Sequence, residues 1–230
     1  MLSYKVKKQT RPTLSNNIFD FDWSQAEEGK INKHLWPSNN YEPETRFYFL
    51  YDEENLWGLL LTRGEHELDP RAEVEEFKGA VHNDSCLEFF MSFEPDNDYY
   101  LNLETNRNAT IHFGIGENRD ERVLPDKEEL NGLNLYAFNS RENKIKGINF
   151  AYEWGVGFCF PAKMLFELWH KYANASESLD STFYPGQIIK ANLYKCGDMT
   201  VEPHFMAWNE IDTENPDFHR PEYFADFIFE

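Results

Sequence analysis

Short apolar runs separated by polar turns recur along most of this sequence, and they constrain its fold more than any other feature. Residues 46–51 and 55–62 flank a short polar turn and predict a hairpin. Rings carry much of the apolar content, with 20 Phe, 12 Tyr and 6 Trp, and ring-rich runs favour strands. The same pattern predicts strands at residues 86–93, 98–105, 109–115, 133–138, 148–154, 156–160, 187–194, 204–208 and 223–229.

Regular spacing of such short strands predicts an all-β protein, either a sandwich or a barrel. One short helix is expected near residues 161–173, because Pro161 suits a first helical turn and apolar residues then recur on one side. The helix should cap one end of the sandwich. There is no internal repeat or low-complexity linker, and sandwiches of this size commonly form one unit. Residues 1–230 are therefore predicted to form a single domain.

Charge narrows the range of partners. The chain has 41 acidic against 22 basic residues, a formal net charge of −19, which is the wrong sign for neutralising phosphates. We therefore expect no nucleic acid partner, whereas neutral ligands such as glycans are not repelled. No run approaches the roughly 20 apolar residues of a membrane helix, so no membrane partner is expected. No apolar segment follows the basic residues at the start, which predicts a cytoplasmic location for the sequence as written.

Cysteine and histidine form no recognisable metal motif. An odd number of cysteines without a CxxC pair supports neither a disulfide framework nor a zinc site, so we expect each cysteine to be a small buried hydrophobic residue. These thiols are Cys86, Cys159 and Cys196. The histidines match no common zinc spacing, and the candidates are His82, His204 and His219. Residues 96–98 (Asp-Asn-Asp) form an oxygen-rich turn of the kind that calcium uses, although a solvated acidic turn is the favoured interpretation.

Two strand patterns place polar groups among apolar ones. Along residues 98–106, Leu101 and Leu103 point one way and a polar set points the other. That set is Tyr100, Asn102, Glu104 and Asn106. It forms either an ordinary solvated sheet face or a platform for sugar hydroxyls. Glu88 lies between strongly apolar neighbours, where a carboxylate needs a partner, and it either accepts hydrogen bonds from ligand hydroxyls or pairs with a Lys or Arg across the sheet.

Loops supply further candidates. The polar stretches 63–84 and 116–131 are long for turns, and loops of that length often carry binding residues. The C-terminal segment places rings around two prolines, namely Trp208, Phe218, His219 and Tyr223. Such rings either stack on the apolar face of a pyranose or seal the edge of the sandwich.

An enzyme acting on carbohydrate would need two carboxylates across a glycosidic bond, one as the acid and the other as nucleophile or base. Glu88 and Glu104 are the pair available for these roles. No GxSxG, HExxH, GxGxxG or GxxxxGK[ST] motif is present, so catalysis is the less favoured interpretation.

Several segments that together span most of the chain resemble a known family. They are YDEENLWGLLLT, NDSCLEFFMSF, YYLNLETN, ANLYKCGD and the ending PHFMAWNEIDTENPDFHRPEYFADFIFE. The chain resembles the family 9 carbohydrate-binding modules, and more closely the family-9-like single-domain proteins. This resemblance implies a two-sheet antiparallel β-sandwich, immunoglobulin-like or jelly-roll-like. It also implies binding of sugars, often at the reducing ends of glucans or xylans, between two aromatic side chains, and a structural calcium.

The resemblance assigns polar roles residue by residue. The family's strand glutamate corresponds to Glu88, the polar residues of the next strand to Asn102 and Glu104, and a late asparagine to Asn192. An arginine that the family carries on the polar strand is replaced here by Asn102.

The resemblance also assigns the aromatic clamp. The second clamp tryptophan corresponds to Phe218, which keeps a ring. The first is missing, because residues 81–83 (Val-His-Asn) stand in its place, and His82 is the nearest ring there. Together with Trp208 nearby, these residues complete the predicted ligand-binding set, which contains no catalytic residue.

We therefore predict non-catalytic binding of a mono- or oligosaccharide, with no required cofactor. The structural calcium that the resemblance implies is left open. The alternatives are a hydrolase that uses Glu88 and Glu104, and a sandwich that binds protein through its aromatic C-terminus. The family's association with secreted glycan-degrading enzymes leaves an extracellular location as the alternative to the cytoplasmic one. The oligomeric state is left open.

Overall fold

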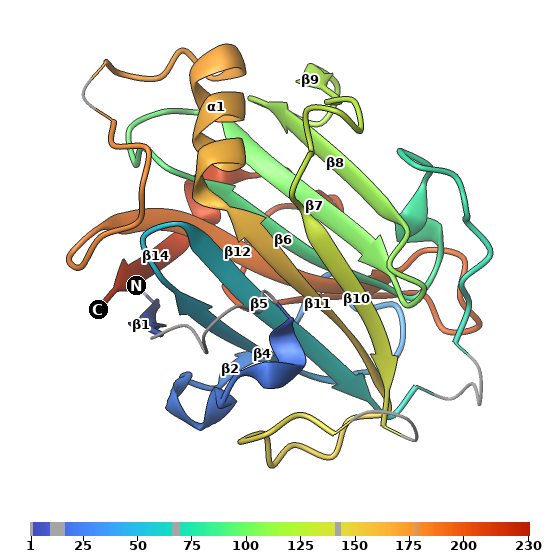
Figure 1. Cartoon of the computed structure of the whole chain (residues 1–230). Helices are drawn as coiled ribbons and strands as arrows, with labels where there is room; N and C mark the ends of the chain where they lie inside the picture. The colour runs from blue at the N-terminus through green and yellow to red at the C-terminus, as the bar shows by residue number, and fades with distance from the viewer. Residues whose placement is uncertain (1, 10–16, 66–69, 141–143, 178) are drawn as a thin grey trace.

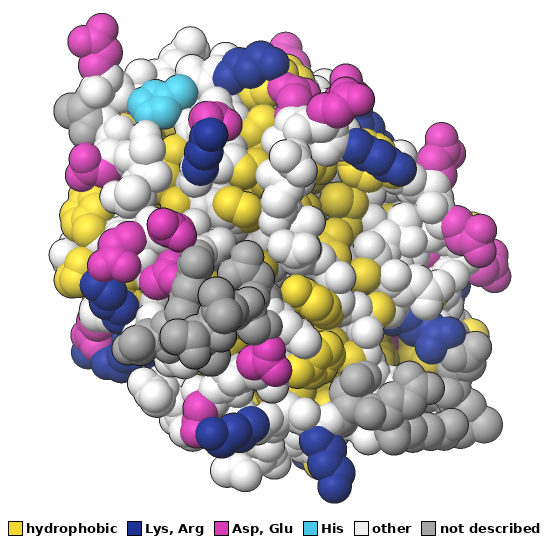
Figure 2. Space-filling view, viewed as in Figure 1, with side chains coloured by type: hydrophobic (Ala, Val, Ile, Leu, Met, Phe, Trp, Pro, Cys, Tyr) yellow, Lys and Arg dark blue, Asp and Glu magenta, His cyan; other side chains and the backbone are white. Residues whose placement is uncertain are grey.

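The computed structural model describes residues 2–9, 17–65, 70–140, 144–177 and 179–230. Two sheets pack face to face, and α1 (Ala162–Tyr172) lies over one end of them (Figure 1). Mostly β structure with one helix confirms the predicted fold class. No helix among the described residues is both long and apolar enough to cross a membrane. Acidic and basic side chains are interspersed over the face seen in Figure 2.

The first sheet is antiparallel. Its strands in spatial order are β10 (Asn134–Asn139), β11 (Trp154–Pro161), β5 (Asn55–Arg63) and β4 (Glu44–Tyr51), and β2 (Gly29–Ile31) pairs with the first half of β4.

The second sheet carries the site described below. Its order is β14 (Ala225–Phe229), β12 (Ile188–Gly197), β6 (Cys86–Ser92), β7 (Tyr100–Asn106), β8 (Ile111–Gly116) and β9 (Arg122–Val123). The second half of β12 pairs with β13 (His204–Ala207), which in turn pairs with β3 (Lys33–His34).

β1 (Ser3–Lys8) joins the two sheets. Residues 3–6 pair with β14 and residues 7–8 pair with β4, in both cases parallel. The prediction of purely antiparallel sheets is therefore wrong at this strand. Tyr4 and Val6 are buried while Lys5 between them is exposed, and this two-residue alternation is what makes the basic N-terminal run a strand.

Each strand predicted from the sequence corresponds to a strand of the structure, with one exception. Of the predicted strand at residues 148–154, only Trp154 enters a strand. This prediction is wrong because the segment covers the outer face of the first sheet instead of extending its ladder. The ring of Phe150 lies 5.1 Å from the guanidinium of Arg46 and 5.0 Å from that of Arg63, and Ile148 packs against the outer apolar cluster of that sheet.

Rings fill the space between the sheets. The ring centroids of Phe49 on β4 and Phe89 on β6 are 4.8 Å apart, and Phe89 stacks on Phe158 of β11 at a centroid distance of 5.9 Å. The outer face of the second sheet buries a separate cluster under the C-terminal segment, which includes Phe90, Tyr100, Tyr194, Phe218 and Phe224. Because that segment folds back over β6 and β7, the outer face is only partly open.

Candidate functional site

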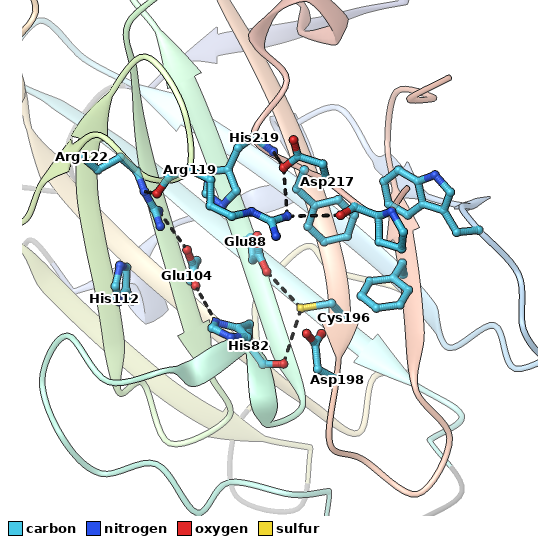
Figure 3. A pocket seen from close by; sticks show the side chains of 14 residues that line it. His82, Glu88, Glu104, His112, Arg119, Arg122, Cys196, Asp198, Asp217 and His219 are labelled. Carbon is cyan, nitrogen blue, oxygen red and sulfur yellow. Dashed lines mark hydrogen bonds and ion pairs between the residues drawn. The ribbon is translucent and has the colours of Figure 1, made fainter. Parts of the chain in front are cut away.

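A cavity of about 320 Å³ lies where the C-terminal segment meets the outer face of β6, β7 and β8 (Figure 3). Both long polar stretches reach it, through His82 from residues 63–84 and through Arg119 and Arg122 from residues 116–131. Its lining combines carboxylates, imidazoles, guanidinium groups and a wall of rings.

Strand register brings the two carboxylates together. Glu88 of β6 and Glu104 of β7 are directly opposite each other, and His112 of β8 is opposite Glu104. Since successive side chains of a strand alternate between its faces, all three residues lie on the outer face. Glu88 and Glu104 are nevertheless buried, because the C-terminal segment covers them.

Glu104 is surrounded by donors. Its carboxylate accepts a hydrogen bond from Asn102 Nδ2 at 2.8 Å and lies 3.5 Å from His82 Nδ1 and 3.4 Å from Arg122 Nη1. Burial raises the pKa of Glu104, but the hydrogen bond to His82 and nearby positive charge such as that of Arg122 outweigh burial and hold the pKa below its ordinary value. In return, the hydrogen bond to Glu104 raises the pKa of His82. Glu104 is therefore a fixed anion in the cavity.

Glu88 has the opposite electrostatic surroundings. Burial, and then the charge of Glu104, raise its pKa well above the ordinary value. Its Oε1 accepts a hydrogen bond from Cys196 Sγ at 3.0 Å. Among the ion pairs of the described residues, none involves Glu88, so the cross-sheet Lys or Arg that one interpretation required is not found there.

Arg122 was missed by the sequence analysis. It projects from β9, and its Nη1 donates to Asn102 Oδ1 at 2.9 Å. Gly114 of β8 makes this approach feasible, because an added Cβ would lie 2.7 Å from Asn102 Oδ1 and 3.4 Å from Arg122 Cδ. Asn102 replaces the arginine that the resemblance leads us to expect, and a guanidinium reaches the same side chain from β9, on the far side of β8. The only sequence signal was the length of the polar stretch 116–131.

The aromatic wall consists of Phe218 with Trp36 and Phe205, two residues that the sequence analysis did not single out. Phe218 stacks on Tyr194 at 4.1 Å with a 7° interplanar angle, so one face of its ring is covered. Trp36 lies 5.9 Å from Phe218, is only partly buried, and is anchored by a hydrogen bond of 2.7 Å from Nε1 to the carbonyl oxygen of Thr213.

Four of the predicted ligand-binding residues meet in the cavity lining: His82, Glu88, Glu104 and Phe218. Asn102 lies directly behind them, fully buried between Glu104 and Arg122.

The other two predicted residues are elsewhere. Trp208 packs between the two sheets, 5.3 Å from Phe227 and 5.6 Å from Phe47. Asn192 is buried and holds the start of the C-terminal segment, since its Oδ1 accepts from the Asn209 amide and its Nδ2 donates to the Asn209 carbonyl. Neither residue lines the cavity.

The turn at residues 96–98 offers little for a calcium ion. Asn97 Oδ1 already accepts from the Tyr99 amide at 3.0 Å, and Asp96 and Asp98 are exposed. Calcium takes about six to eight oxygen ligands, so these residues alone do not fit the ion. A structural calcium stays a prediction.

The fold and the cavity together define a β-sandwich binding module with a ring-walled, polar site on the outer face of one sheet. The chain belongs to carbohydrate-binding family 9, whose model matches residues 16–229. No curated protein sequence matches the chain.

Solved structures show the same fold. A Bacteroides uniformis protein described as carbohydrate-binding is 24% identical, with a TM-score of 0.76 over 99% of both chains. A family 9 carbohydrate-binding module from Caldicellulosiruptor kristjanssonii, in complex with glucose, is 11% identical, with a TM-score of 0.60 over 100% of this chain and 96% of that one. A family 9 module from the same organism, in complex with cellotriose, is also 11% identical, with a TM-score of 0.60 over 100% of this chain and 94% of that one.

Proposed function

We propose that the cavity binds carbohydrate without cleaving it. The observation that carries this proposal is a row of buried polar groups facing the cavity beside a wall of rings. His112 lines the cavity, its Nδ1 lies 3.1 Å from the carbonyl oxygen of Lys78, and its buried Nε2 has no hydrogen-bond partner among the described residues. Buried polar atoms rarely stay unpaired, so Nε2 is suited to a ligand hydroxyl.

The chemistry of the lining matches a sugar. The exposed part of Trp36 and the edge of Phe218 offer an apolar surface for a pyranose ring, while Glu104, Arg122 and His112 offer acceptors and donors for its hydroxyls. The volume is near the lower end of the roughly 300–1,000 Å³ typical of small-molecule sites. We infer a monosaccharide or a chain end, such as the end of a glucan or xylan, as the ligand. The sugar complexes of related modules support this choice.

Calorimetry with glucose and cellotriose at millimolar concentration tests the site. We expect binding, and we expect Arg122→Met to weaken it by about tenfold or more, because a hydrogen bond from a charged group contributes about 1.5–3 kcal/mol. Arg63→Met is the matched control, since Arg63 pairs with Glu44 on the other sheet. Absence of binding across a panel of neutral sugars contradicts the function, and unchanged binding by Arg122→Met places the sugar elsewhere.

One observation favours a glycoside hydrolase as a second candidate. Glu88 and Glu104 are opposite each other and their pKa values shift in opposite directions, as in an acid and nucleophile pair. Release of reducing sugar that is abolished in Glu88→Gln would establish this candidate and exclude a purely binding role.

A further inference from the structure

Two cysteines distant in sequence meet beside the cavity. Cys86 opens β6, Cys196 lies near the end of β12, and the two residues are directly opposite each other in the strand register. Both are buried free thiols. Their spacing of 110 residues carries no metal motif, so the sequence alone predicts two separate small buried hydrophobes.

Glu88 completes the cluster. It lies two residues beyond Cys86 on the same face of β6, and its Oε1 is 3.0 Å from Cys196 Sγ. The ligand atoms of Cys86, Glu88 and Cys196 all lie within 4.8 Å of one another. No other group of three such side chains is found in the part of the chain that the structure describes.

These distances suit one small ion. Zinc bonds to sulfur at about 2.3 Å and to carboxylate oxygen at about 2.0–2.2 Å, so tetrahedral ligand atoms are about 3.6–3.8 Å apart. To reach that arrangement, Cys196 Sγ and Glu88 Oε1, which are 3.0 Å apart, would have to separate by about half an ångström, and the other ligand atoms, all within 4.8 Å of one another, would have to shift by about 1 Å or less. Two sulfur ligands favour a thiophilic ion over calcium or magnesium, which take oxygen.

An open path supports the same conclusion, and so does the pairing of the nearby cations with other side chains. Glu88 and Cys196 line the cavity, so an ion could enter from it and keep a fourth position facing it (Figure 3). The nearby cation Lys195 points to the opposite face of β12 and is paired with Glu65 at 3.0 Å. Arg122 is held by Asn102 and Glu104.

We propose that Cys86, Glu88 and Cys196 form a binding site for a thiophilic divalent metal ion of the zinc class, with one coordination position open to the cavity. Three protein ligands with an open fourth position are typical of zinc sites that bind a further molecule. This proposal depends only on the geometry of these three side chains, so it can be tested independently of sugar binding.

Cobalt is the probe. Chelator-treated protein, kept reduced with a phosphine and free of sugar, is titrated with Co²⁺. We expect sulfur-to-cobalt charge-transfer absorption and the visible bands of a tetrahedral site, which saturate at one ion per chain and disappear when Zn²⁺ is added. Each of Cys86→Ser, Cys196→Ser and Glu88→Gln should weaken Co²⁺ binding by about tenfold or more, since even second-shell changes cost about 10- to 100-fold.

Cys159→Ser is the matched control. Cys159 is the third buried thiol, and it lies on β11 in the other sheet, with its Sγ 3.5 Å from Asn55 Oδ1. This variant should keep the full cobalt spectrum. A wild-type titration without the sulfur-to-cobalt band overturns the proposal whether or not the variants fold. An equal loss of the band in Cys159→Ser, or its retention in both Cys86→Ser and Cys196→Ser, overturns it as well.

Discussion

His219 shows how neighbours set the chemistry of a single residue. Its Nδ1 lies 2.8 Å from the hydroxyl of Tyr100, and its ring lies 5.0 Å from that of Phe90. Burial, followed by the charge of Arg122, lowers its pKa to about 3. The imidazole is therefore neutral in the folded protein and shares a hydrogen bond with the Tyr100 hydroxyl.

This lowered pKa predicts a pH-dependent loss of stability. An unfolded histidine binds a proton near pH 6.5 and folded His219 only near pH 3, so between these values the unfolded state binds more protons and stability falls as the pH falls. From pH 7 to pH 5 the wild type should lose up to about 2 kcal/mol more unfolding free energy than His219→Gln. Urea unfolding at pH 7, 6 and 5 measures this difference, with His170→Gln on α1 as the control for losing an exposed histidine. If the unfolding free energies of the wild type and His219→Gln change with pH by the same amount, the effect is ruled out.

At the scale of the element, the sequence predicted the strands and the hairpin of β4 with β5 well, but it did not predict which distant strands become neighbours. The alternation that separates Leu101 from Asn102 and Leu103 from Glu104 is local, and the structure shows the leucines in the core and the polar pair on the outer face. Which strands become neighbours depends on loop geometry and on long-range packing, which no local pattern records. That is why Arg122 was not foreseen beside Asn102.

Residues that occupy expected positions can still face away from the site. Trp208 follows β13 at about the predicted place, but a bend of the chain directs its ring between the sheets. Trp36, by contrast, sits in a short irregular segment with a positive φ of 46°, which gave no strand or helix signal. The family resemblance located the carboxylates and Phe218, and only the three-dimensional structure located Trp36 and Phe205.

β1 is tied to the core by the hydroxyl of its buried Tyr4. The Tyr4 hydroxyl donates to the carbonyl oxygen of Glu27 at 2.6 Å and accepts from the amide of Phe49 at 2.9 Å, so it links β1 to β4 inside the core. Tyr4→Phe leaves both groups unpaired and should cost about 1–3 kcal/mol of unfolding free energy. The exposed Tyr184→Phe should stay within about 0.5 kcal/mol of the wild type in the same urea titration. Equal stability of the two variants would show that β1 adds packing alone.

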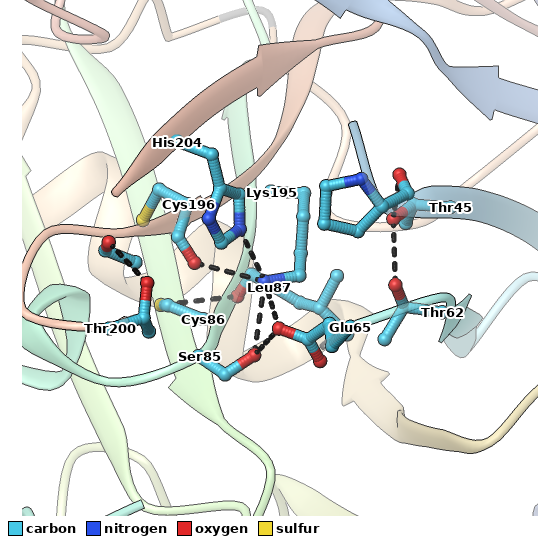
Figure 4. Close-up of polar contacts among 12 residues, drawn as sticks. Thr45, Thr62, Glu65, Ser85, Cys86, Leu87, Lys195, Cys196, Thr200 and His204 are labelled. Atoms are coloured by element: carbon cyan, nitrogen blue, oxygen red, sulfur yellow. Dashed lines mark hydrogen bonds and ion pairs between the residues drawn. The ribbon is translucent and has the colours of Figure 1, made fainter. Parts of the chain in front are cut away.

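At the scale of the whole molecule, a buried polar network joins the two sheets at one end (Figure 4). Lys195 of β12 is fully buried and lies 3.0 Å from Glu65, which follows β5 and also accepts from the indole nitrogen of Trp154. Lys195 Nζ further contacts Ser85 Oγ at 3.0 Å and His204 Nε2 at 2.8 Å. Burial raises the pKa of Glu65, but Lys195 and the other donors outweigh it and hold the pKa below its ordinary value.

Such a network stabilises only while it is complete, because a buried charge without its partner is costly. Lys195→Met removes the cation and leaves Glu65 buried, which should cost about 3–5 kcal/mol. Lys190→Met on the same strand breaks a half-exposed pair with Asp226 and should cost at most about 1 kcal/mol.

The double variant Lys195→Met with Glu65→Leu separates charge from packing. Replacing both charges by apolar side chains of similar size should recover most of the loss, since a well-packed apolar pair often matches a buried ion pair in stability. Urea unfolding of the wild type, both single variants and the double variant gives the coupling energy. If the double variant is no more stable than Lys195→Met, the lost stability comes from packing between the sheets rather than from the orphaned Glu65 charge, and the two sheets are held together there by shape alone.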